Sequence, residues 1–86
     1  MEKLTHVEEE TMQAVWRTGE GNVKAFMEKL DEELPYTTVA STIKNLEKKG
    51  YLISRLMGNV YLYKPQVTEA DYKKKFMGNV VKDYFD

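Results

Sequence analysis

Cysteine is absent from this chain of 86 residues, and histidine occurs once, as His6. Without cysteine there is no disulfide framework and no thiolate metal site, and a lone histidine cannot form a histidine-based metal site by itself. No apolar run is long enough to span a bilayer. The N-terminus is Met-Glu-Lys followed by polar residues, with no apolar stretch, so we expect no signal peptide. We therefore expect a small cytoplasmic protein that binds no metal and does not insert into a membrane.

The residue patterns typical of catalysis are also missing. His6 has no serine or aspartate partner by motif, and Gly19-Glu20-Gly21 is a lone turn rather than a phosphate-binding loop. The three consecutive acids at 8–10 are typical of the first turn of a capped, solvated helix rather than of a catalytic pair. We expect neither enzymatic activity nor a cofactor.

The net charge of −1 hides an uneven distribution along the chain. Residues 1–35 hold nine acids and four bases (−5), residues 36–65 hold five bases and one acid (+4), and residues 66–86 hold four of each. Phosphates respond to charge within a Debye length, roughly 10 Å at moderate ionic strength. The segment 36–65 is therefore the part of this chain suited to nucleic acid, although charge also fluctuates along sequences that bind none.

Two amphipathic helices are predicted in the acidic first third. Thr5 and Glu8 have the spacing of a capping box, so the first helix should begin there, with Trp16 on its apolar side. Asn22 is a good N-cap for the second helix. The apolar residues of that helix recur at helical spacing and predict a buried stripe of Val23, Phe26, Met27 and Leu30.

A third helix is predicted from Tyr36 to Lys49, ending at Gly50. At about 100° per residue, one side gathers the apolar residues Tyr36, Val39, Ile43 and Leu46. The opposite side holds hydroxyls, an amide and lysines, and no acid: Thr37, Ser41, Lys44, Asn45 and Lys48, flanked by Thr38, Thr42 and Lys49. Small hydroxyls permit close approach to a DNA backbone, and these side chains can bind phosphates or base edges.

Residues 51–64 alternate in polarity and turn at Gly58-Asn59, which predicts a β-hairpin. A two-residue loop there would pair Met57 with Val60. The same register would pair Leu56 with Tyr61. The hairpin face expected to pack on the core would hold Leu52, Leu56, Tyr61 and Tyr63, and the other face would hold Arg55.

A further helix is indicated after the hairpin, because Thr68 and Asp71 have the spacing of another helix start. Large apolar side chains then recur every fourth residue at Tyr72, Phe76, Val80 and Tyr84. A free-standing helix would expose this stripe, and such patches usually mark an interface, so we expect it to mediate homodimerisation. The alternative is that the helix folds back on Trp16 and the first helix, which would give a monomer.

These patterns predict a mainly α fold with a small β-hairpin. The fold would be a winged helix-turn-helix of three helices and a two- to three-stranded wing, followed by a C-terminal helix. Residues 1–65 would form the DNA-binding domain and residues 66–86 the start of a dimerisation region. The candidate DNA-binding residues are Thr37, Thr38, Ser41, Lys44, Asn45, Lys48, Arg55 and Asn59. The alternative function is a module whose outward helix binds protein; an acidic outer face would favour it, and the third helix has none.

Several short motifs follow one another along the chain in a specific order. They are Leu4-Thr5, Glu8, Met12 and Trp16, then Tyr36-Thr37-Thr38-Val39, Leu46 and Lys49-Gly50, then Gly58, Tyr61, Tyr63 and Pro65, and finally Thr68-Glu69-Ala70-Asp71-Tyr72. Any one of these motifs is weak evidence, but their order and spacing are fairly specific. Over nearly its whole length the chain thus resembles the penicillinase-repressor (BlaI/MecI/CopY) family of bacterial winged-helix regulators.

The resemblance implies a transcriptional repressor that binds a palindromic operator in double-stranded DNA as a homodimer. Helix 36–49 would enter the major groove, and hairpin 51–64 would touch the flanking backbone. The family often has arginine where Asn45 and Asn59 stand, so this chain lacks a positive charge at each position. Its affinity and base preference are therefore expected to differ from those of better-known members.

The resemblance also bears on partners and regulation. The copper-sensing branch of the family relies on C-terminal cysteines, which this chain lacks. The penicillinase branch implies a membrane-bound sensor metallopeptidase as a further partner, which triggers cleavage of the repressor. In the family, the cleavage site and the dimerising helices lie beyond the winged domain, so we expect this chain to hold only the beginning of the dimerisation region.

Overall fold

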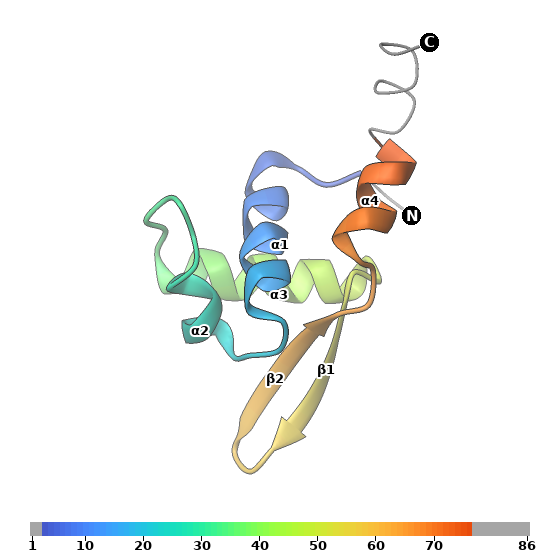
Figure 1. Cartoon of the computed structure of the whole chain (residues 1–86). Helices are drawn as coiled ribbons and strands as arrows, with labels where there is room; N and C mark the ends of the chain where they lie inside the picture. Colours follow the sequence, from blue (N-terminus) through green and yellow to red (C-terminus); the bar gives the residue numbers. More distant parts are fainter. Residues whose placement is uncertain (1–2, 77–86) are drawn as a thin grey trace, which may run out of the picture.

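The computed structural model describes residues 3–76 as four helices and one hairpin (Figure 1). The helices α1 (His6–Thr18), α2 (Val23–Met27) and α3 (Tyr36–Lys48) come first, the antiparallel strands β1 (Leu52–Met57) and β2 (Val60–Pro65) follow, and α4 (Glu69–Phe76) comes last. In Figure 1 the hairpin extends away from the helices, and α4 lies at the opposite end of the described structure. This arrangement confirms the predicted winged helix-turn-helix with a C-terminal helix.

The predicted caps of the first two helices are present. The Thr5 hydroxyl accepts a hydrogen bond from the backbone N–H of Glu8 (3.2 Å), and the Glu8 carboxylate accepts one from the N–H of Thr5 (2.9 Å). Asn22 caps α2, because its side-chain oxygen accepts from the N–H of Ala25 at 2.9 Å. Leu30 lies beyond the end of α2 but still packs against the core.

The third helix buries its predicted apolar side with one exception. Val39, Ile43 and Leu46 are 0% exposed. Tyr36 belongs to the same side by helical spacing, but it is 52% exposed. Tyr36 is the first residue of α3, where the helix has not yet reached the core. The helix stops as predicted before Gly50, whose φ of +87° is readily reached only by glycine.

The wing has the predicted register. Met57 lies opposite Val60 across the two-residue turn, and Gly58 at its start has the positive φ (+63°) that such tight hairpin turns need. Gly21 forms an isolated antiparallel bridge with β2, because its N–H and C=O form hydrogen bonds of 3.0 and 2.8 Å with the backbone of Tyr63. The loop between α1 and α2 is thereby joined to β2.

Only the base of the wing packs on the core. Leu52 and Tyr63 are 2% and 8% exposed, whereas Leu56 and Tyr61, on the same face of the hairpin, are 61% and 56% exposed. The prediction that Leu56 and Tyr61 pack on the core was therefore wrong. The cause is that the hairpin extends beyond the helices that could cover its outer half (Figure 1).

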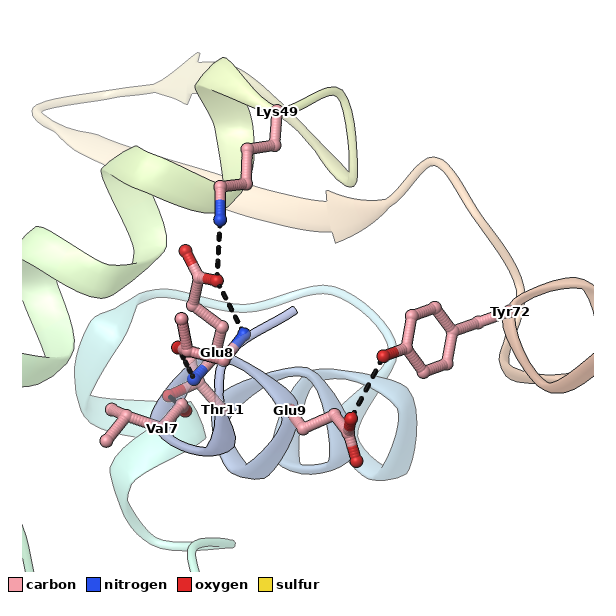
Figure 2. Close-up of polar contacts among 7 residues, drawn as sticks. Val7, Glu8, Glu9, Thr11, Lys49 and Tyr72 are labelled. Atoms are coloured by element: carbon pink, nitrogen blue, oxygen red, sulfur yellow. Dashed lines mark hydrogen bonds and ion pairs between the residues drawn. The ribbon is translucent and has the colours of Figure 1, made fainter. Parts of the chain in front are cut away.

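The last described helix folds back onto the winged domain. Its predicted cap is present, since the Thr68 hydroxyl accepts from the N–H of Asp71 at 3.0 Å. Tyr72 is 2% exposed, and its ring centroid lies 5.8 Å from that of Trp16 and 5.9 Å from that of Tyr51. The Tyr72 hydroxyl donates to a Glu9 carboxylate oxygen at 3.0 Å. This contact joins α4 to α1 (Figure 2).

Part of the apolar stripe proposed for dimerisation therefore packs against the chain's own winged domain. Tyr72 faces its own core and offers no ring to a partner, which corrects its assignment to an outer surface. Phe76 is half-buried and packs on Tyr72 with a centroid distance of 4.9 Å. Val80 and Tyr84 lie outside the described residues. Within the described part of the chain, Phe76 is the member of the stripe that keeps an accessible side.

Candidate nucleic-acid interface

The outward face of α3 is polar and accessible. Thr37, Ser41 and Lys44 are exposed, and so are Asn45 and Lys48. They lie opposite the buried residues that hold α3 against α1 and the base of the wing. We call these five side chains the α3 face. Their exposure follows from the helical period, because a helix with one apolar stripe must present its other side to solvent.

The flanking threonines differ from the α3 face. The Thr42 hydroxyl donates inward to the carbonyl of Thr38 at 2.7 Å, and Thr42 is 7% exposed. Thr38 itself is half-buried. The Ser41 hydroxyl donates to the same carbonyl at 3.1 Å but stays exposed, so it can turn toward an outside acceptor. Ser41 is therefore better placed for a direct DNA contact than Thr38.

The single acid of the segment 36–65 is held by the wing. Glu47 borders the α3 face beside Asn45 and Lys48. Its carboxylate accepts a hydrogen bond from the hydroxyl of Ser54 on β1. This bond keeps the carboxylate directed toward the wing and limits its repulsion of a phosphate approaching Lys48.

Lys49 points away from the α3 face, although helical spacing placed it on the flank. Its ammonium lies 2.7 Å from a Glu8 carboxylate oxygen (Figure 2). Burial of Glu8 by itself raises the pKa of this carboxyl, but the hydrogen bond and charge of Lys49 and the hydrogen bonds from Thr5 outweigh burial and leave the pKa below 4.5. Lys49 thus joins α3 to α1, whereas Lys48 remains on the outward face.

Arg55 lies on the outer side of the wing, as predicted, but it has an acidic partner. Its guanidinium forms a two-point ion pair with Glu20, with Nε–Oε2 and Nη2–Oε1 distances both of 2.9 Å. Hydrogen bonding to Arg55 is the main cause that lowers the pKa of Glu20, and the same contact raises the pKa of Arg55. Glu20 therefore offsets part of the positive charge that the sequence alone assigned to the wing.

An open groove runs between the start of α2, the first turns of α3 and the tip of the wing. It is lined by Asn22, Val23, Lys24, Tyr36, Ala40, Lys44, Asn59, Val60, Tyr61 and Tyr63. Two lysines and the exposed phenols of Tyr36 and Tyr61 are suitable groups for a phosphate strand. The groove thus continues the α3 face onto the wing and brings Lys44 and Asn59 into one surface.

Sequence reasoning missed three groove residues: Lys24, Tyr36 and Tyr61. The two tyrosines were read as core residues because they fall on apolar stripes. Each lies at the end of its element, Tyr36 at the start of α3 and Tyr61 beside the wing turn, where a stripe can run past the core. The position of each tyrosine near the end of its helix or strand was the sequence signal that could have indicated its exposure. No signal in the sequence placed Lys24 near α3.

Residues with metal-ligand chemistry also meet near the start of α1. Ligand atoms of His6, Glu10 and Glu32 lie within 4.8 Å of one another. His6 and Glu32 are exposed, and the 3.4 Å contact between His6 Nε2 and a Glu32 oxygen is that of a surface ion pair when the imidazole is protonated. This group shows no feature beyond such a pair.

A sequence profile described as "Penicillinase repressor" matches residues 4–86. The chain belongs to this family. A search of curated proteins gave no match. Membership confirms the resemblance seen in the sequence motifs and places the chain among transcriptional regulators. Family membership also agrees with the observed fold, in which a wing follows a helix with a polar outward face. None of the helices in residues 3–76 is both long and apolar enough to cross a membrane.

Proposed function

We propose that this penicillinase-repressor family member represses transcription by binding a palindromic operator in double-stranded DNA as a homodimer. In this proposal α3 enters the major groove, and the hairpin lies along the flanking DNA. The observation that supports it best is the α3 face, whose five exposed side chains are hydroxyls, an amide and lysines. Such side chains donate to phosphates and read base edges.

The surroundings of the α3 face support the same proposal. The groove beside it adds Lys24 and the phenols of Tyr36 and Tyr61. Lysine ammonium groups and phenols would hold the sugar-phosphate backbone, while Asn45 and Ser41 would face the bases. Backbone contacts fix the register of a protein on DNA, and base contacts supply the sequence preference. The α3 face and the groove thus offer both kinds of contact on one continuous surface.

The proposal includes a homodimer as the form that binds DNA. Two copies bound to a palindrome would place their α3 helices about one DNA turn or a multiple of it apart. Residues 66–86 would contribute to the contact between copies, with Phe76 at the edge of the described surface. The sensor metallopeptidase implied by the family resemblance stays a prediction.

Fluorescence anisotropy with labelled duplexes tests the proposal. A preferred site is first selected from fragmented genomic promoter DNA, and a shuffled duplex of equal length serves as control. Neutralising roughly six to ten phosphates should lower affinity by about 10³–10⁵ between 50 and 200 mM salt. Failure to bind any duplex at low salt would overturn the repressor proposal and favour a protein-binding module.

A further inference from the structure

The tip of the wing is apolar on both of its faces. Leu56 and Tyr61 are opposite each other on one face and are 61% and 56% exposed. Met57 and Val60 are opposite each other on the other face and are 54% and 44% exposed. Four adjacent apolar side chains around one turn form an exposed patch of the kind that marks an interaction surface. We call these four residues the wing tip.

The wing tip lacks the charge that would suit it to phosphates. The wing contains two basic residues, Arg55 and Lys64. Arg55 is held by Glu20 through two hydrogen bonds of 2.9 Å, and Lys64 pairs with Ile53 near the base of the hairpin. Between Arg55 and Lys64 the tip offers three aliphatic side chains, the uncharged phenol of Tyr61 on the groove side and the amide of Asn59. A contact made by this tip would therefore depend on shape and burial rather than on phosphate neutralisation.

The position of the wing tip indicates DNA as its partner. Val60 and Tyr61 line the same groove as Lys24 and Lys44, so the tip continues the lysine-bearing surface of α3. In Figure 1 the hairpin points away from α4, so the turn of the hairpin lies at the far end of the described structure from α4. A protein that places α3 in the major groove would bring this tip against the neighbouring stretch of the same duplex.

We propose that the wing tip inserts into the minor groove as an apolar wedge and bends the operator. Met57 and Val60 would enter at a base step, and Gly58, which has no side chain, lets the turn approach the groove floor closely. Proteins that insert apolar side chains there partly unstack the step and bend DNA by roughly 20–90°. Asn59 would donate to the A·T acceptors of the minor groove. This inference rests on the proposed DNA-binding function.

Bending and salt dependence together test the wedge. The full chain is titrated onto its selected duplex carrying donor and acceptor dyes at the ends and 2-aminopurine at the flanking step. Binding should shorten the end-to-end distance and raise 2-aminopurine fluorescence. The double variant Met57→Ala/Val60→Ala should lose both signals and bind about tenfold more weakly, because two apolar groups are no longer buried. Its salt slope should equal that of the wild type, since no charge is removed.

The matched control is Ile53→Ala, which removes an exposed apolar side chain (45%) at the base of the same hairpin. It should leave bend and affinity unchanged. Bound DNA that stays straight, or a double variant that bends DNA like the wild type, would overturn the wedge while leaving the repressor proposal intact. A double variant with unchanged DNA binding but a reduced sedimentation mass would overturn it in favour of a second copy of this chain. Absence of DNA binding by the wild type would overturn both proposals.

Discussion

The ammonium of Lys49 lies 2.7 Å from a carboxylate oxygen of Glu8, although 41 residues separate them in sequence. The Glu8 side chain is 8% exposed and that of Lys49 is 22% exposed. The same Glu8 carboxylate also caps α1 through the N–H of Thr5. One side chain therefore fixes both the start of α1 and the end of α3, the helix that presents the proposed DNA-binding face.

Replacing Glu8 with glutamine should destabilise the fold by about 1–3 kcal/mol. The loss is smaller than that expected for a fully buried pair, because Lys49 stays in contact with water. The measurement is the free energy of unfolding in urea. Glu28→Gln, an exposed acid just after α2, is the control with the same change in charge and should alter stability by less than about 0.5 kcal/mol.

The pH dependence of stability checks the same pair independently. The pKa of Glu8 is lowered from 4.5 in the folded chain, so folding favours its carboxylate form. This contribution is present above pH 4.5 and is lost as the pH falls through the lower, folded-state value. The wild type should therefore lose more stability than Glu8→Gln on acidification below pH 4.5. Parallel pH curves for the two proteins would contradict the assigned role.

Tyr72 should make the fold sensitive to alkaline pH. Burial, and then its hydrogen bond to Glu9, raise the pKa of Tyr72 from 10.0 to about 12. A raised pKa means that the stabilising contribution is complete below pH 10 and is lost as the pH rises toward 12. Tyr72→Phe should cost roughly 1–2 kcal/mol at neutral pH, because a hydrogen bond to a charged group is lost. The free energy of unfolding of this variant should also fall less steeply than that of the wild type between pH 10 and 12. An unchanged alkaline slope would count against the assigned role of Tyr72.

Removing the Glu20 carboxylate should strengthen DNA binding. Glu20 holds the Arg55 guanidinium with two hydrogen bonds of 2.9 Å, so Glu20→Gln frees a cation on the wing. If Arg55 then reaches one phosphate, the slope of log affinity against log salt should steepen by about 0.9. Anisotropy titrations at several salt concentrations measure it. Glu28→Gln controls for net charge, and an equal increase in both variants would show that Arg55 gains no contact.

Dimerisation through α4 should depend on Phe76. The wild type is expected to show a sedimentation mass that rises above 10.1 kDa across micromolar concentrations. Phe76→Glu should hold the mass at the monomer value, because a charge replaces the accessible ring at the edge of the stripe. Lys75→Gln makes the same change in charge on an exposed neighbour and should not affect association. A mass fixed at 10.1 kDa in all three proteins would remove the dimer from the proposal.

Local signals in the sequence predicted the order of elements correctly. The capping box at Thr5 and Glu8, the Asn22 cap and the Gly58-Asn59 turn each depend on residues a few positions apart. Such short-range patterns determine where an element starts and where a hairpin turns. They allowed the winged helix fold and the wing register to be deduced without tertiary information.

Long-range pairing could not be deduced in the same way. Nothing in the sequence showed that Arg55 meets Glu20 or that Lys49 meets Glu8, because these contacts depend on how the helices pack. The apolar stripes were also an incomplete guide to burial. They predicted the direction of Tyr36 and Tyr61 but not that each lies past the edge of the core. The outward residues of α3 were predictable, while the groove that continues them onto the wing was not.

The most direct test of α3 as the reading helix compares two of its variants on two DNAs. Asn45→Ala should weaken binding to the selected site by roughly 1–3 kcal/mol and leave binding to a shuffled duplex nearly unchanged, since an amide can read a base edge. Lys48→Ala should weaken binding to both duplexes alike and reduce the salt slope by about one, because its ammonium is proposed to contact phosphate. Anisotropy titrations of the wild type and both variants supply these values. Equal losses on the two duplexes for both variants, or no loss for either, would contradict the account.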